Sequence, residues 1–174
     1  MRALADAELI HRFMRALGTE AAEHGAVYFT GGATAVLLVR LARTLVIDVL
    51  LIPEQERVLR AVPRLKDELQ VNVELASPRD FIPVPDGWEG RSIFAAREGR
   101  LSFYHFDPYA QALAKIERGH AQDLEDVQAL VERGLVDPSR ALTYLDEVEE
   151  ELYRYPALDA ASFRRRVEEA FLAR

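Results

Sequence analysis

An almost unbroken run of apolar and β-branched residues, Thr44 to Ile52, constrains the fold of this chain more than any other feature. Such a run is typical of a strand that is buried on both faces, as in a sheet flanked by helices. Shorter runs predict further strands over 27–29, 71–75, 91–97 and 100–106. The spacing of apolar residues between these strands predicts helices over 3–17, 33–41 and from Pro53 to about residue 69.

The chain after residue 106 is expected to be helical to its end. A loop rich in proline and glycine is expected over 77–90. Breaks at Gly119, Gly134 and Pro156 divide the C-terminal part into helices over 107–118, 121–133, 138–153 and 159–173. The predicted fold class is α/β (α+β), with a mixed sheet flanked by helices and followed by a C-terminal helical region. We expect residues 1–106 to form the α/β core and residues 107–174 to pack on it as one compact unit.

The composition of the chain excludes several classes of protein. The 174 residues include no cysteine, which rules out disulfides, thiolate zinc sites and cysteine nucleophiles together. No apolar run approaches the length of a membrane span, which predicts a cytoplasmic protein without a membrane partner. The net charge of −7 disfavours general binding to nucleic acid, because phosphates are neutralised by Lys and Arg. The local run Arg164-Arg165-Arg166 is interpreted as a solvated helix face.

The segment Thr30-Gly31-Gly32 lies between a predicted strand and a predicted helix. Two glycines let the backbone approach a phosphate closely, and the start of the following helix offers free N–H groups and the positive end of its dipole. The same pattern is typical of an ordinary tight turn. The segment therefore identifies a candidate phosphate site without establishing one.

Two acidic residues interrupt the apolar strands. Asp48 lies within the run from Thr44 to Ile52, and Glu74 lies within the strand 71–75. A carboxylate in such surroundings is costly to bury unless it is paired or binds a metal; a strand-end aspartate that reaches solvent is the alternative. If the two strands are adjacent and aligned, Asp48 and Glu74 share one face and form a pair suited to Mg²⁺.

A third candidate is the corner between two predicted C-terminal helices. Lys115 and Arg118 lie one turn apart before Gly119, and Asp123 and Asp126 lie one turn apart after it. A corner tied by ion pairs between these side chains is the structural alternative to a binding role. The four histidines lack ligand spacing, so none of them is predicted to bind a metal.

The order of these features resembles that of the DNA polymerase β-like nucleotidyltransferases: Gly-Gly before a helix, an acid-bearing strand, and a third acid in a later strand. The segment Lys115 to Val127 resembles the Lys…Arg-Gly…Asp-Leu-x-Asp stretch of the bacterial AbiEii/MenT-like group, which includes toxins of type IV toxin–antitoxin systems. The likeness runs from about Tyr28 to Leu135. It implies a nucleotidyltransferase-like fold and Mg²⁺-dependent transfer of a nucleotide from a nucleoside triphosphate to a hydroxyl of protein or RNA, tRNA included. It also implies a cognate antitoxin as partner.

The resemblance also assigns roles to individual residues. The nucleotide-binding residues that it implies are Gly31, Gly32, Thr44, Lys115 and Asp123. The catalytic residues that it implies are Asp48, Glu74 and Lys115, with Asp48 and Glu74 as the metal ligands. In this pattern Glu74 helps to activate the attacking hydroxyl, Lys115 neutralises phosphate charge, and Asp123 orients the phosphate or closes the site.

One position departs from the family pattern, in which the motif usually reads Thr-x-Asp-x-Asp. Alignment on Thr44 and Pro53 places Val46 where the first metal-binding acid of the motif stands. Since side chains alternate along a strand, Val46 and Asp48 are expected on the same face. Valine cannot bind Mg²⁺, and we expect loss of a metal-binding carboxylate to cost several powers of ten in rate, by analogy with the loss of a preorganised electrostatic group. Two hypotheses follow: a nucleotidyltransferase that uses Asp48 and Glu74, and a catalytically inactive relative that binds a nucleotide, an RNA or a protein partner.

Overall fold

The computed structural model describes residues 2 and 4–172, so the helix expectations for residues 3 and 173 lie outside the described part. The chain divides into two compact units: Met1–Ser77 with Ser92–Phe106, and Pro78–Arg91 with Asp107–Arg174. The sequence-based boundary at residue 106 left residues 78–91 in the α/β core, whereas in the structure they belong to the second unit. Within residues 2 and 4–172, no helix combines the length and the apolar character needed to cross a membrane.

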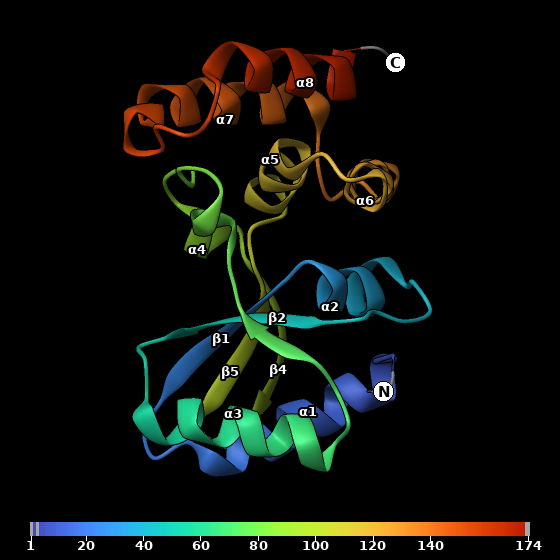
Figure 1. The fold of residues 1–174 in the computed structure, drawn as a ribbon, viewed down its shortest axis with the longest axis vertical. Coiled ribbons are helices and arrows are strands. Elements are labelled where there is room, and N and C mark those ends of the chain that lie inside the picture. The colour runs from blue at the N-terminus through green and yellow to red at the C-terminus, as the bar shows by residue number, and fades with distance from the viewer. Residues whose placement is uncertain (1, 3, 173–174) are drawn as a thin grey trace. The chain divides into compact units, whose positions relative to one another are not determined.

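The first unit contains a five-stranded mixed sheet (Figure 1). Its strands are β1 Gly25–Thr30, β2 Ile47–Ile52, β3 Val73–Leu75, β4 Ile93–Glu98 and β5 Leu101–His105. Its helices are α1 Ala7–Glu20, α2 Gly32–Thr34, a π-helix Ala35–Val39 and α3 Glu56–Glu68. The strand order is β3-β2-β1-β5-β4; β1 is parallel to β5 and antiparallel to β2, and β2 is parallel to β3. The predicted fold class is confirmed.

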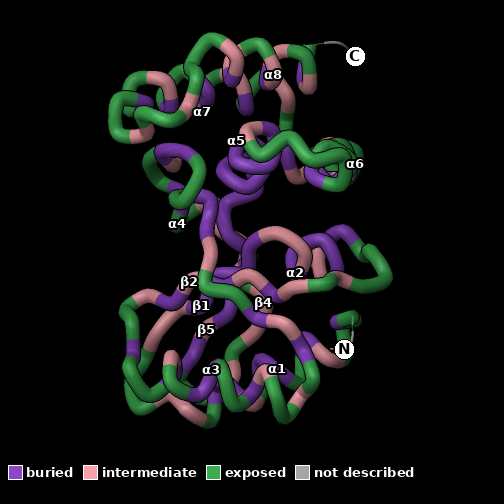
Figure 2. Tube along the Cα trace, viewed as in Figure 1, coloured by how far each residue is buried: buried purple, intermediate pink, exposed green. Residues whose placement is uncertain are grey.

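Helices α1 and α3 pack against one face of the sheet (Figure 1). The first helix begins after Asp6, whose carboxylate accepts a hydrogen bond of 2.9 Å from the Leu9 N–H group, as is typical of a helix N-cap. Phe13 and Leu17 on its inner side are buried in the same core as Val49 of β2. Burial alternates along β2 because only one of its faces contacts this core (Figure 2).

Several predicted element boundaries are wrong. The strand expected from Thr44 begins at Ile47, and the expectation that both of its faces are buried is wrong, because Asp48, Leu50 and Ile52 are half-buried. The helix expected over 33–41 is a single α-turn that continues as a π-helix, and the helix expected from Pro53 begins at Glu56. The two shifted starts lie at the ends of elements, where local sequence signals compete with tertiary packing.

The second unit is helical. Its elements are a 3-10 turn Pro78–Asp80, α4 Trp88–Arg91, α5 Pro108–Arg118, α6 Ala121–Glu132, α7 Pro138–Glu150, a 3-10 turn Leu152–Arg154 and α8 Ala160–Leu172. The loop expected over 77–90 therefore contains one short helical turn and the start of another. The helix α5 begins with Pro108, which is suited to the first helical position, and ends at Gly119, which has φ +71°.

The arginine run 164–166 of α8 is engaged in ion pairs. Each guanidinium group lies within 4.0 Å of a carboxylate, and the partner residues are Glu117, Asp146, Glu149, Glu168 and Glu169. Arg164 joins α8 to α7 through a hydrogen bond of 2.7 Å to Glu149. The run thus ties helices together, and its charge is balanced by neighbouring acids.

Candidate functional site

The turn that follows β1 consists of Gly31 and Gly32, and its packing requires both glycines. Gly31 has φ +61°, and a Cβ atom at this position would lie 2.7 Å from Oδ2 of Asp48. A Cβ atom on Gly32 would collide with the hydroxyl group of Thr44. Positive φ and close backbone approach are both properties of glycine. The turn therefore lies directly against Asp48 and Thr44, so three features that are separate in the sequence form one place in the structure.

Asp48 and Glu74 are aligned on neighbouring strands. Asp48 of β2 is in register with Thr30 of β1 on one side and with Glu74 of β3 on the other. Residues in register on adjacent strands project to the same face of a sheet. Asp48 is half-buried and Glu74 is exposed. The condition that their strands be adjacent and aligned is met at the sheet edge where β1 ends and β2 begins.

Thr44 and Val46 lie before β2. The backbone N–H and carbonyl groups of Thr44 each form a hydrogen bond of 2.8 Å with Ala5, and its hydroxyl group donates to the Val46 carbonyl oxygen at 3.0 Å. Because the strand begins at Ile47, strand alternation does not extend to Val46, and the argument that placed it on the face of Asp48 does not hold. Among residues 2 and 4–172, no group of three or more His, Cys, Asp or Glu side chains is arranged to hold a metal ion.

Lys115 and Asp123 lie in the second unit, within a buried ion-pair network. The Lys115 amino group is 2.6 Å from Oδ2 of Asp126 and 3.4 Å from Oδ1 of Asp123, and all three residues are buried. Arg118 Nε lies 3.2 Å from Oδ2 of Asp123, at an ion-pair distance but without hydrogen-bond geometry. The ion-paired helix corner, which the sequence analysis gave as the alternative to a binding role for this segment, is therefore present. Asp48 and Glu74, which the resemblance joins to Lys115 in one site, belong to the first unit.

His105, the last residue of β5, was not singled out by the sequence analysis. It is 3% exposed, and burial lowers the pKa of its imidazole to about 4. Its Nδ1 atom lies 3.1 Å from the hydroxyl oxygen of Thr34, the last residue of α2. A signal for its burial is present in the sequence, since His105 continues the alternating pattern of Leu101 and Phe103, which are both buried.

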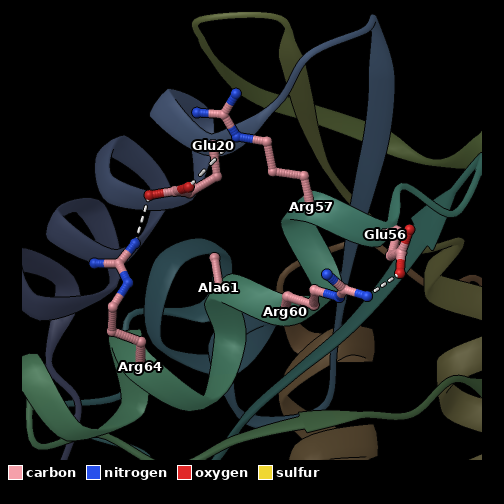
Figure 3. A pocket seen from close by; sticks show the side chains of 6 residues that line it. All are labelled: Glu20, Glu56, Arg57, Arg60, Ala61 and Arg64. Atoms are coloured by element: carbon pink, nitrogen blue, oxygen red, sulfur yellow. Dashed lines mark hydrogen bonds and ion pairs between the residues drawn. The ribbon is translucent and has the colours of Figure 1, made fainter.

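A shallow groove of about 340 Å³ lies on the surface of α1 and α3 (Figure 3). Its lining residues are Glu20, Glu56, Arg57, Arg60, Ala61 and Arg64. The guanidinium groups face carboxylates: Arg64 pairs with Glu20 at 2.5 Å, and Arg60 pairs with Glu56. The acids of the groove thus balance the positive charge that would attract a phosphate. The groove also lacks the glycine turn beside a carboxylate that Gly31, Gly32 and Asp48 form.

Similarity to known proteins is found at the level of a family. A family model described as "Nucleotidyltransferase of unknown function (DUF6036)" matches residues 8–165. No curated protein and no solved structure matches the chain. The matched range includes the turn, the aligned acids Asp48 and Glu74, and the buried network around Lys115.

Proposed function

The chain belongs to this nucleotidyltransferase family, and we propose that it transfers a nucleotide from a nucleoside triphosphate to a hydroxyl group in a reaction that depends on Mg²⁺. In this proposal Gly31 and Gly32 contact the triphosphate, and Asp48 and Glu74 bind the metal ion. The observation that carries the proposal is the contact of the Gly31–Gly32 turn with Asp48. A phosphate can approach the backbone of a glycine turn closely, and the Asp48 carboxylate beside this turn is a ligand of the kind that Mg²⁺ prefers.

The residues present fit a magnesium ion that is held partly by its substrate. Mg²⁺ prefers oxygen ligands, and one or two carboxylates commonly bind it together with phosphate oxygens. Asp48 and Glu74 are in register, and both retain some exposure to solvent. A phosphate that accepts hydrogen bonds from the turn would lie next to Asp48. Since α2 has only three residues, the proposed phosphate contact is assigned to N–H groups of the turn and not to a helix dipole.

The proposed chemistry is a single displacement at phosphorus. The hydroxyl oxygen of the acceptor forms a bond to the α-phosphorus atom, the bond from that atom to the bridging oxygen breaks, and pyrophosphate leaves. Glu74 takes the proton of the attacking hydroxyl on its carboxylate, and its exposure leaves room for an acceptor. When bound, Mg²⁺ neutralises negative charge on the triphosphate.

The acceptor and partner in this proposal rest on the likeness of the segment Lys115 to Val127 to the AbiEii/MenT-like group. The acceptor hydroxyl belongs to an RNA, such as tRNA, or to a protein, and a cognate antitoxin is the partner. The same likeness assigns phosphate contacts to Lys115 and Asp123, which are buried against each other. Phosphate binding by Lys115 would require its amino group to leave Asp126, and substitution of Lys115 tests this part of the proposal.

Titration with ATP, GTP, CTP and UTP, each with and without Mg²⁺, tests the function directly. We expect one or more triphosphates to raise the melting temperature of the protein in the presence of Mg²⁺, and Asp48→Asn to abolish this effect. Glu125→Gln, which changes an exposed acid of α6, is the matched control and should leave the effect intact. Transfer is then measured as incorporation of α-labelled nucleotide into tRNA or protein. Absence of any shift in the wild-type protein contradicts the proposal.

Val46 favours a second candidate function, that of a catalytically inactive relative which binds a nucleotide, an RNA or a protein partner. The resemblance implies an acid at the position of Val46, and no cluster of three potential ligands occurs among the described residues. Val46→Asp separates the two functions. A large gain in transfer on this substitution, from a protein that binds triphosphate but does not turn it over, identifies the wild type as the inactive relative. Transfer by the wild type itself excludes that candidate.

A further inference from the structure

A buried hydrogen bond connects two residues that are far apart in the sequence and close to the Gly31–Gly32 turn. Thr34 follows Gly32 by two residues, and its hydroxyl oxygen lies 3.1 Å from Nδ1 of His105, which is 71 residues away. The same hydroxyl group donates to the carbonyl oxygen of Phe29 at 3.3 Å. Thr34 is 2% exposed and His105 is 3% exposed. The contact thus joins α2 to β5 and β1 inside the first unit.

One arrangement of protons makes hydrogen bonds of both contacts. A carbonyl oxygen only accepts, so in this arrangement the single hydroxyl proton of Thr34 is directed to Phe29. The hydroxyl oxygen is then the acceptor for an N–H group on Nδ1 of His105. Burial lowers the pKa of His105 to about 4, so the imidazole is neutral at pH 7 and carries one N–H group. The neutral tautomer with its proton on Nδ1 satisfies both contacts at once.

The short helical segment that contains Thr34 depends on tertiary contacts for its position. It consists of three α-helical residues followed by a five-residue π-helix, and short helices depend on tertiary contacts for their stability. Thr34 is at the end of the α-helical part, and Gly31 and Gly32 are at its start. A shift of this segment would move the turn away from Asp48, which lies within contact distance of Gly31.

We propose that His105 is a positioning residue: through Thr34 it fixes the Gly31–Gly32 turn in the arrangement that binds the triphosphate. This inference rests on the proposed function, since it assigns His105 to the same phosphate contact. His105 itself does not touch the substrate in this arrangement. His105 keeps the turn ordered before the nucleotide binds, so that binding does not include the entropic cost of ordering the turn.

The test uses two disruptive variants, two conservative ones and a control. Thr34→Val and His105→Leu remove the hydrogen bond, whereas Thr34→Ser keeps the hydroxyl group and His105→Asn offers an amide N–H near the position of Nδ1. Leu101→Ala, at the opposite end of β5 and fully buried, controls for a general loss of stability. The readouts are amide hydrogen exchange of residues 30–36 and the dissociation constant of whichever of ATP, GTP, CTP and UTP binds the wild type with Mg²⁺.

We expect the disruptive variants to exchange faster over residues 30–36 and to bind the triphosphate about tenfold more weakly, as loss of one buried hydrogen bond predicts. The conservative variants should recover most of the affinity, and Leu101→Ala should keep it although it melts at a lower temperature. Unchanged exchange over the turn, or faster exchange with unchanged affinity, overturns the role of His105 while leaving the proposed function standing. A wild-type protein that binds no triphosphate overturns the proposed function and, with it, this inference.

Discussion

The two units of the chain differ in charge. The first has 11 Lys and Arg against 11 Asp and Glu, whereas the second has 11 against 18, so the net charge of −7 belongs to the second unit. Several cations of the second unit are paired with acids, as Lys115 is with Asp126 and Arg91 with Asp107. Arg91 also stacks over the ring of Tyr144, 4.3 Å from its centroid. The net negative charge of the second unit repels a phosphate-bearing ligand. Such a ligand would have to take the place of a carboxylate beside one of the paired cations.

Carboxylates in the two units are held under opposite conditions. Asp48 and Glu74 of the first unit retain exposure at the edge of a sheet, whereas Asp123 and Asp126 of the second are buried against a lysine. A carboxylate that retains exposure can exchange water for a metal ion, but a buried ion pair must first be broken. This difference favours the first unit for the proposed metal and phosphate contacts, and a stabilising role for the buried ion pairs of the second.

Removal of the lysine of the buried network is expected to have the largest effect. Lys115→Met leaves the buried Asp126 without its cation and Asp123 with Arg118 alone, which should lower the free energy of unfolding by roughly 3–5 kcal/mol. Lys66→Met, at the only other lysine of the chain, should change it by less than about 0.5 kcal/mol. Urea unfolding measures both. A small loss for Lys115→Met together with loss of triphosphate binding would break the comparison, because it would assign Lys115 to the ligand.

Acidification should destabilise the first unit through His105. Its pKa is lowered to about 4 in the folded protein, against 6.5 for the free side chain, so between these values the unfolded chain binds a proton that the folded chain does not. The stability that neutral His105 contributes is complete above pH 6.5, and about 3 kcal/mol is lost as the pH falls to 4. His105→Asn lacks this loss. Urea unfolding of both proteins at pH 7 and at pH 4.5 isolates it, and parallel profiles would show that His105 is not buried neutral.

The glycine of the turn should be less tolerant of substitution than a matched glycine of the second unit. Gly31 and Gly134 have φ values of +61° and +69°, but only Gly31 has a neighbour, Asp48, within reach of an added Cβ atom. Gly134→Ala should cost about 1 kcal/mol for its backbone conformation alone, and Gly31→Ala about 2 kcal/mol. Thermal unfolding with and without triphosphate measures the difference. Equal losses in the free energy of unfolding, with triphosphate binding retained in both variants, would show that the turn is not part of the proposed binding site.

The smallest effect is expected at the groove on α3. Arg60 and Glu56 are exposed, and exposed ion pairs contribute little to stability. Arg60→Ala should change the free energy of unfolding by less than about 0.5 kcal/mol and should leave the dissociation constant of the triphosphate unchanged. A marked loss of affinity would instead identify the groove as a second anion site of the first unit. That result would strengthen the assignment of triphosphate binding to the first unit over the second.

Much of the fold was predictable because hydrophobic periodicity is a local property. The strand around Asp48, the hairpin near Gly99 and the helix that ends at Gly119 all follow from the spacing of apolar residues and from glycine positions. Element ends were less predictable: the strand start at Thr44 failed because this residue pairs with Ala5, a contact that no local pattern encodes. The match of the family model confirms the nucleotidyltransferase resemblance at the level of the family, while residue roles stay predictions.

The sequence by itself determined the residue types available for chemistry: a Gly-Gly turn, an acid in an apolar strand, and a valine where a second acid is expected. Tertiary structure alone decided which of them meet. Strand register aligns Asp48 with Glu74, the turn closes on Asp48, and Lys115 is paired with Asp126. The role proposed for His105 follows only from its contact with Thr34. The physical reason is that register, close approach and burial depend on residues distant in sequence, whereas composition and periodicity do not.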